Sequence, residues 1–444
     1  MSSYTSNNNP VETGQNAWFS INSFPYQPRI LEQNINCDWL VLGGGFAGLS
    51  AAYRLTQLRP KDKVVVIDAL KIGEGSAGQN SGFMIDLPHN ISASGNYTDS
   101  LEKDKKTIEL HRHAMRFAKE IAEECNVAKD DFLQIGKING AATESSIVWN
   151  DQYQKQLQDL KEDHQVFDRK EMKELTGSDF YQSGLFTPGT VLFHPSNYVR
   201  TIATKLRESC EIFDNTPALS INSQNNSWLV QTPKASISSA NIIFAINGHI
   251  QNFGFYKNRL IHLFTFAAVT QKFSKEELSG QDQWGITPAN PVGTTVRKIK
   301  DGDGFRLLVR NQWQCQQSMQ INQSILESKK KQLRQSFEIR FPMLKVLPFE
   351  FTWGGKVCLS MNNVPAFGEL DQGLYSACCS NGLGSINGTL SGKFIVDKLC
   401  QSNDQTYLSF ENAEKPTLLP PNFLTQMGAN INIKTKEWRA GREL

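Results

Sequence analysis

The chain has 444 residues, of which 39% are hydrophobic, and a formal net charge of +2 at pH 7. This length exceeds what one hydrophobic core usually holds, so we expect two domains. The near-neutral charge gives no indication of nucleic acid or an anionic membrane as a partner.

Two further patterns narrow the class of protein. No apolar run reaches the ~18 residues of a membrane span, and the polar first residues lack the pattern of a signal peptide. We therefore expect a cytoplasmic protein. The eight cysteines are scattered without a C-x-x-C pair, so we predict neither a metal site nor a thioredoxin-like redox pair.

Residues 1–36 read as an N-terminal leader. The segment is polar and irregular in pattern, but it carries Trp18, Phe19, Phe24 and Tyr26. Large aromatic side chains are mostly buried in folded proteins, so we expect these four to pack against the body of the protein.

The next stretch has the pattern of a dinucleotide-binding unit. Trp39–Leu42 is an apolar run typical of a buried strand, and Gly43–Gly48 fits G-x-G-x-x-G. Helix-forming residues follow, and Val64–Ile67 reads as a second strand that ends at Asp68. A strand, a glycine loop, a helix and an acid about 25 residues on together indicate a dinucleotide fold. Asp68 is expected to accept hydrogen bonds from the ribose hydroxyls.

Each glycine of the loop has a separate expected role. Gly43 permits the tight turn, Gly45 lets the backbone approach a pyrophosphate, and Gly48 permits close packing of helix on strand. Phe46 and Ala47 begin the helix, where free N–H groups and the positive end of the helix dipole favour phosphate.

A second loop, rich in glycine, serine and asparagine, follows at residues 72–84. A plain surface loop is one interpretation. Its place directly after Asp68 favours a second backbone approach to the cofactor. The residues expected to meet the cofactor there are Ser76, Ala77, Asn80, Ser81 and Gly82. Phe83 and Met84 would then enter an apolar substrate site.

The middle of the chain alternates helices and short strands. Helices are predicted at Leu101–Cys125 and at residues 152–164, 196–209 and 324–341. Strands are predicted at residues 132–146, 180–194, 227–232, 240–246, 262–272 and 292–311.

Near residue 373 the first pattern returns. Gly373–Ser380 reads as a strand, Asn381–Gly388 as a glycine-rich turn and Ser391–Leu399 as a helix. We therefore predict an α/β fold, α+β overall, with a Rossmann-like domain built from both ends of the chain and an inserted antiparallel-sheet substrate domain. The predicted boundaries are 1–36 for the leader; 37–95, 195–255 and 354–405 for the nucleotide-binding domain; 96–194 and 256–353 for the substrate domain; and 406–444 for a C-terminal extension.

Several short motifs follow one another in a specific order. After the loop at Gly43–Gly48 they are Gly75–Gly82, His194-Pro195, Ala245–Gly248, Trp353–Gly355, Pro365–Gly368 and Asn381–Gly392. In this order they resemble the FAD-dependent amine and amino-acid oxidases of the D-amino-acid oxidase superfamily, and within it the gamma-glutamylputrescine oxidases. The resemblance covers about Cys37 to Leu399.

The resemblance implies an enzyme that binds FAD and oxidises the C–N bond of a small-molecule amine or amino acid. Oxygen would be the electron acceptor and hydrogen peroxide the product. The further cofactor contacts that it implies are Asn247, Gly248, Asn381, Gly382, Leu383 and Gly384.

Two positions depart from the family pattern. Gln79 stands where the family usually has arginine, so a contact inferred from that arginine does not transfer. Ile386 stands where sarcosine oxidases have a lysine that binds the substrate carboxylate. Ile386 would then be an apolar contact to the substrate, and an amine is favoured over a small amino acid held by its carboxylate.

The resemblance also indicates where catalytic groups would lie. A basic side chain beside the flavin would stabilise negative charge during the reaction with oxygen. The candidates are Arg297, Arg306 and Arg310, for each of which a surface charge is the alternative. Trp353, Phe264 and Phe266 would wall the active site, although aromatic residues are as typical of a core.

Cys358 lies near the position where sarcosine oxidases link the flavin to cysteine. We expect it to be a buried, inert thiol, so that FAD is bound non-covalently.

One alternative function keeps the same fold. The chain would then be an amine dehydrogenase that passes electrons to a quinone or a partner protein, and the sequence does not separate the two. A pyridine-nucleotide–disulfide reductase would need a second G-x-G-x-x-G and a redox C-x-x-x-x-C, and neither is present.

Overall fold

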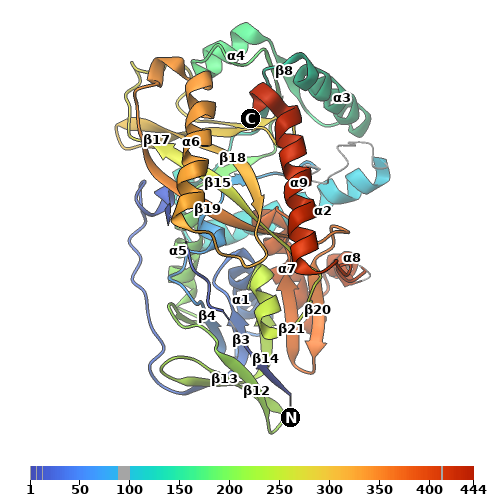
Figure 1. The fold of residues 1–444 in the computed structure, drawn as a ribbon. Coiled ribbons are helices and arrows are strands. Elements are labelled where there is room, and N and C mark those ends of the chain that lie inside the picture. The colour runs from blue at the N-terminus through green and yellow to red at the C-terminus, as the bar shows by residue number, and fades with distance from the viewer. Residues whose placement is uncertain (1, 7, 13, 89–100, 412–413) are drawn as a thin grey trace.

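The computed structural model describes residues 2–6, 8–12, 14–88, 101–411 and 414–444. Within these residues the strands form two nine-stranded sheets and one three-stranded sheet. Figure 1 shows one large sheet in the lower half of the molecule and the other in the upper half.

The lower sheet has a parallel centre. Its central strands, in spatial order, are β21 (Leu374–Cys378), β14 (Ser236–Phe244), β3 (Ile35–Leu42), β4 (Val64–Ile67) and β11 (Glu211–Phe213). The antiparallel strands that extend it are β1 (Ser3–Thr5), β12 (Ser220–Gln224), β13 (Ser227–Gln231) and β20 (Ala366–Asp371). All four residues of β4 are buried, as expected of a parallel strand covered on both faces.

Helices from distant parts of the chain cover this sheet. They are α1 (Phe46–Leu58), α2 (Leu101–Glu124), α5 (Pro195–Leu206) and α7 (Thr389–Leu399). Their apolar faces share one hydrophobic cluster with inward residues of β3 and β4 such as Val41 and Val66. The first and last predicted motifs therefore meet in one sheet-and-helix layer.

The upper sheet is almost entirely antiparallel. Its order is β2 (Gly14–Gln15), β19 (Phe349–Leu359), β15 (Ile261–Thr270), β18 (Gly304–Cys315), β17 (Thr295–Asp301), β16 (Trp284–Pro288), β7 (Lys137–Ala141), β9 (Ser183–Thr187) and β8 (Gln165–Phe167). The pair β16–β7 is parallel. The small third sheet contains β5 (Phe83–Met84), β10 (Val191–Phe193) and β6 (Phe132–Gln134).

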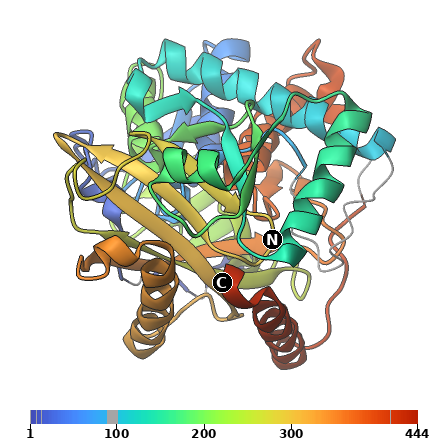
Figure 2. The same cartoon turned by 90° about the horizontal axis from the view of Figure 1, so that it is seen from above.

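Two helices lie on the outer side of the upper sheet, α6 (Gln323–Arg340) and α9 (Asn422–Ala440) (Figure 2). The remaining helices are α3 (Glu144–Leu160), α4 (Arg169–Thr176) and α8 (Leu408–Glu411). Successive side chains of a strand point to opposite faces of the sheet. Asn311 points outward and donates to Ser336 Oγ of α6 at 2.7 Å, so its neighbour Arg310 faces the interior of the molecule.

The predicted fold class is confirmed, because a parallel sheet with covering helices is joined to an antiparallel sheet. One predicted helix is misplaced. The helix expected at residues 152–164 is α3, which begins at Glu144 because Thr143 Oγ1 accepts a hydrogen bond from Ser146 N at 3.3 Å and caps the helix. The leader aromatics Trp18 and Tyr26 are buried, as expected.

The predicted domain boundaries stay predictions. The boundary at 95/96 lies outside the described residues. The boundary at 353/354 falls within β19, which pairs with β15 along most of its length. Among the described helices, none is long and apolar enough to cross a membrane.

Candidate active site

A cavity lies between the ends of the parallel strands and the inner face of the antiparallel sheet. In open α/β sheets, ligands bind outside the carboxyl ends of the strands. The predicted cofactor contacts that line it are Gly43, Gly45, Phe46, Ala47, Asp68, Ser76, Ala77, Asn80, Ser81, Asn247, Gly248, Gly382, Leu383 and Gly384. Segments from both ends of the chain thus reach one site.

The first glycine loop has the geometry of a phosphate cradle. Gly43 has a φ of +105°, and a Cβ on Gly48 would lie only 1.7 Å from the carbonyl oxygen of Gly43. A Cβ on Gly45 would meet only Ala77 Cβ, at 3.3 Å. Among the described residues, no side chain caps the first turn of α1, so its N–H groups are open to an anion in the cavity.

Asp68 closes this end of the cavity. Its Oδ2 accepts from Gly44 N at 2.7 Å and its Oδ1 from Leu70 N at 2.8 Å. Burial raises the pKa of Asp68 to about 6, and the charges of Asp214 and Glu12 add to this rise. The two backbone bonds orient the carboxylate and leave lone pairs for the hydroxyls of a ribose.

The second loop is held from behind by buried side chains. Trp18 Nε1 donates to Asn80 O, and Trp353 Nε1 donates to Gln79 O, both at 2.8 Å. Arg297 donates to the carbonyls of Gly82 at 2.9 Å and Phe193 at 2.6 Å.

This arrangement gives Arg297 and Trp353 a different place from the one predicted. Both were expected at the reacting centre, but neither lines the cavity, and their polar groups bond backbone carbonyls of the loop or of β10. Burial lowers the pKa of Arg297 to about 9. A Cβ on Gly82 would lie 2.0 Å from Arg297 Nη1, so this glycine makes room for the arginine and does not itself line the cavity.

The closing segment at 381–388 is also shaped by internal bonds. Asn381 Oδ1 accepts from Ser360 N at 2.8 Å and lies outside the cavity lining. Ser385 Oγ donates to Phe83 O at 3.1 Å and ties this segment to the second loop. Around Gly384 the space is open. The backbone at Gly382–Gly384 is therefore accessible to a planar ligand.

Of the four predicted substrate contacts, only Phe83 lines the cavity. Met84 and Ile386 are fully buried in the cluster beneath the helices. Phe266 pairs with Asn311 on β18 and, like Asn311, points away from the cavity. Lys329 Nζ of α6 lies 5.7 Å from the centre of the Phe266 ring. The structure places these three side chains in cores.

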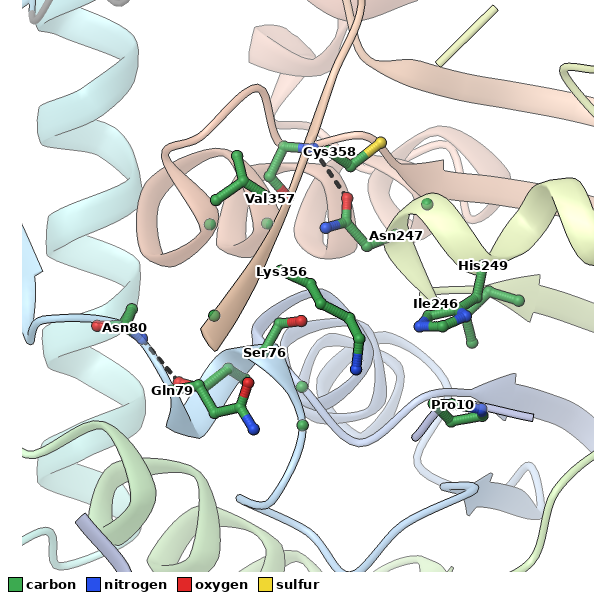
Figure 3. Close-up of a pocket in the computed structure, with 18 of the residues that line it drawn as sticks. Pro10, Ser76, Gln79, Asn80, Ile246, Asn247, His249, Lys356, Val357 and Cys358 are labelled. Atoms are coloured by element: carbon green, nitrogen blue, oxygen red, sulfur yellow. Dashed lines mark hydrogen bonds between the residues drawn. The ribbon is translucent and has the colours of Figure 1, made fainter. Parts of the chain in front are cut away.

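The leader contributes a wall that the sequence did not indicate. Asn8, Asn9, Pro10 and Glu12 line the cavity. Figure 3 shows Pro10, Gln79 and Lys356 around the same space.

The contacts of Glu12 explain how this wall is held. Lys356 Nζ donates to Glu12 Oε1 at 2.6 Å, and Gln79 Nε2 donates to Glu12 Oε2 at 2.7 Å. Lys356 and Gln79 thus both bind the carboxylate of Glu12. Residues so far apart in sequence give no local signal of this contact.

Two histidines line the cavity, and both are neutral at physiological pH. Burial lowers the pKa of His249 to about 3 and that of His262 to about 4. His262 Nε2 lies 2.6 Å from Gln251 Oε1, within hydrogen-bond distance. These imidazoles can shape the cavity, but they carry no proton to donate as imidazolium.

Cys358 lines the cavity and is not merely a core residue. A hydrogen bond with the Cys379 thiol, together with burial, raises the pKa of Cys358 well above its usual value. A protonated thiol is a weak nucleophile, which favours non-covalent binding of a cofactor.

The comparisons decide the family. A family model described as "FAD dependent oxidoreductase" (DAO) matches residues 38–398. The chain belongs to this family. Its cofactor is therefore FAD, and the site fits it, with open N–H groups at α1, an oriented acid at β4 and accessible backbone at Gly382–Gly384.

Individual relatives are distant but cover most of the chain. The probable oxidoreductase OrdL of Haemophilus influenzae is 22% identical over 94% of this chain and 95% of its own length. The gamma-glutamylputrescine oxidoreductase of Escherichia coli is 22% identical over 89% of this chain and 91% of its own. The glycine oxidase structure from Geobacillus kaustophilus superposes with a TM-score of 0.68 at 15% identity, covering 87% of this chain and all of its own.

A matched pair of substitutions tests the glycine loop. Gly45→Ala adds a methyl 3.3 Å from Ala77 Cβ, which a small local shift relieves, in the loop assigned to the pyrophosphate. We therefore expect a folded protein whose FAD affinity falls at least ~10-fold. Gly48→Ala forces a clash within the protein, and we expect it to lose about 3 kcal/mol of stability or more. Thermal unfolding and FAD titration measure the two effects. Full FAD occupancy in Gly45→Ala would refute the assignment of the phosphate site.

The state of Cys358 predicts how the flavin behaves on denaturation. Because the thiol is protonated, we expect acid precipitation to leave all yellow colour in the supernatant. Absorbance of supernatant and pellet measures the split. Colour that stays in the pellet, and moves to the supernatant in Cys358→Ala, would show a covalent link.

Proposed function

We propose that this protein oxidises a small amine at the carbon that bears nitrogen, with oxygen as electron acceptor and hydrogen peroxide as product. The observation that carries the proposal is one cavity in which two FAD-binding segments face the inner side of an antiparallel sheet. The E. coli relative, a gamma-glutamylputrescine oxidoreductase, supports an amine as the donor.

The roles of the protein groups follow from their positions. When bound, FAD would supply the acceptor for the hydride equivalent of the substrate carbon. The first-turn amides of α1 would hold its pyrophosphate, and Asp68 would hold its ribose. The backbone N–H groups of Gly384 and Ser385, at the start of the π-helical turn, would lie beside the flavin ring and would favour the negative charge that arises on reduction.

The cavity offers no evident catalytic base, which also favours an amine. Among its described lining residues, Glu12 is ion-paired with Lys356, and Asp68 is bonded to backbone at the far end. Burial lowers the pKa of His249 to about 3 and that of His262 to about 4, which makes both imidazoles weak bases. A neutral amine can lose hydride without a protein carboxylate to remove a proton. The protein therefore needs only to position the C–H bond and exclude water.

Anaerobic mixing with a panel of amines tests the proposal. The panel contains polyamines, gamma-glutamyl amines, N-methyl amines and D-amino acids. We expect an amine to bleach the flavin band, and air to restore it with one peroxide formed per amine oxidised.

Two other outcomes would correct the proposal. If only the D-amino acids bleached the flavin, the other three classes of amine would be excluded as substrates. Bleaching by an amine with negligible peroxide in air would show an electron acceptor other than oxygen, as in the dehydrogenase alternative.

A further inference from the structure

Helix α9 turns its polar side to the protein and its apolar side to solvent. Three of its polar side chains accept hydrogen bonds, at 2.8–3.0 Å, from backbone N–H groups of β18 and the segment after it. They are Gln426, Asn430 and Glu437. The buried residues of α9 are only Thr425 and Ala440. A surface helix usually packs its apolar face on the core, so α9 has the reverse orientation.

The apolar side chains of α9 lie together on its solvent side. With 3.6 residues per turn they fall within an arc of about 100°. They are Phe423, Leu424, Met427, Ile431 and Trp438, hereafter the apolar stripe. Trp438 is 81% exposed and Phe423 is 71% exposed. Single exposed apolar residues are normal, whereas a contiguous apolar patch on a surface indicates a place where a partner binds.

The charges beside the apolar stripe are positive. Lys434 lies between Ile431 and Trp438, Arg439 follows directly, and both basic side chains are exposed. The one acid of α9, Glu437, faces the sheet. Among the described residues, no carboxylate forms an ion pair with Lys434 or Arg439. The formal net charge of +2 is an average over the whole chain and conceals this local excess.

The shape of the molecule lets a flat surface reach α9. Figure 2 shows α9 and α6 projecting from the same side of the molecule. The apolar stripe is about 22 Å long at 1.5 Å per residue. A helix with aromatic and aliphatic residues on one face and basic residues beside them is typical of segments that lie in the plane of a membrane surface. Tryptophan suits that depth, because its ring is apolar and its N–H is polar.

We propose that α9 docks this protein on the surface of an anionic lipid bilayer. The apolar stripe enters the headgroup region, and Lys434 and Arg439 contact the anionic phosphates. A second copy of the chain fits less well, because a symmetric dimer would bring the same patch against itself and place like charges together. The inference concerns the outer surface of the protein and does not depend on the substrate that it oxidises.

Sedimentation with lipid vesicles measures the docking. The FAD-bound protein is mixed with vesicles of phosphatidylcholine alone or of phosphatidylcholine and phosphatidylglycerol in equal amounts, and the bound fraction gives the partition coefficient. We expect the anionic vesicles to bind at least ~10-fold more strongly at low salt. Added salt should weaken this preference, because it screens exposed charges.

A matched pair of double variants tests the apolar stripe. The stripe variant is Phe423→Gln with Trp438→Gln, and its control is Val148→Gln with Val166→Gln, which removes two exposed apolar side chains elsewhere. We expect the partition coefficient to fall at least ~10-fold in the stripe variant alone. Because all four side chains are exposed, both variants should keep the thermal unfolding temperature and the FAD content of the unsubstituted protein.

A second pair of double variants tests the charges. Lys434→Gln with Arg439→Gln should remove most of the preference for anionic vesicles while binding to neutral vesicles stays the same. Lys61→Gln with Lys300→Gln removes two exposed charges elsewhere and should leave the preference unchanged.

Quenching of tryptophan fluorescence locates the helix in the bilayer. Vesicles whose acyl chains carry bromine quench a tryptophan that enters the headgroup region. Trp438→Phe keeps an apolar ring, so we expect nearly the same partition coefficient but less quenching than in the unsubstituted protein. Equal quenching in the two proteins would show that α9 stays outside the bilayer and would overturn the inference.

Three other results would also overturn it. The first is an equal partition coefficient in the stripe variant and its control. The second is a dimer in solution that dissociates only in the stripe variant, with no binding to vesicles, which would assign the apolar stripe to a second copy of the chain. The third is a monomer that binds neither kind of vesicle, which would leave another protein as the partner.

Discussion

The position of the whole site depends on two contacts that only glycine permits. A Cβ on Gly48 would lie 1.7 Å from Gly43 O, and a Cβ on Gly392 would lie 2.0 Å from Ala47 O. The first contact seats α1 on the turn that follows β3, and the second seats α7 against α1. Because α7 follows the closing segment directly, the same packing brings the segment near Gly384 beside the N-terminus of α1. Two parts of the chain more than 300 residues apart thus line one cavity.

Two arginines on the inner face of the antiparallel sheet have different roles. Arg297 and Arg310 lie on adjacent strands and face the same side. Arg297 bonds the backbone carbonyls of Gly82 and Phe193, so its charge fixes the second loop against β10. Among the residues that the structure describes, Arg310 bonds no backbone carbonyl, and it lines the cavity. One arginine shapes the site, and the other is left to recognise what enters it.

The cofactor half of the site could be predicted because its signals are local. Strand, glycine loop, helix and acid follow one another within about 30 residues, and each has a steric or electrostatic reason to stand where it does. The return of the pattern near residue 381 was likewise a local signal.

The substrate half could not be predicted, because it depends on register. Successive residues of β15 take opposite faces, so Thr265 lies on the cavity face while Phe266 points toward α6. The register shift between them, where β15 meets β18, pairs Thr265 with Trp313. An aromatic residue on a predicted strand gives no indication of which face it takes. The contact of Glu12 with Lys356 and Gln79 joins three distant segments, and the convergence of Thr295, Arg310 and Trp313 needs the pairing of separate strands.

The central claim is that the cavity places the nitrogen-bearing carbon of an amine against the flavin for loss of hydride. The most direct measurement is anaerobic rapid mixing with the reactive amine and with the same amine deuterated at that carbon, with the rate of flavin bleaching recorded at saturation. The account predicts slower bleaching with the deuterated amine, because the C–H bond breaks as the flavin is reduced. The account would be contradicted if the flavin bleached equally fast with the amine deuterated at that carbon and with the unlabelled amine, while deuteration at another carbon slowed bleaching.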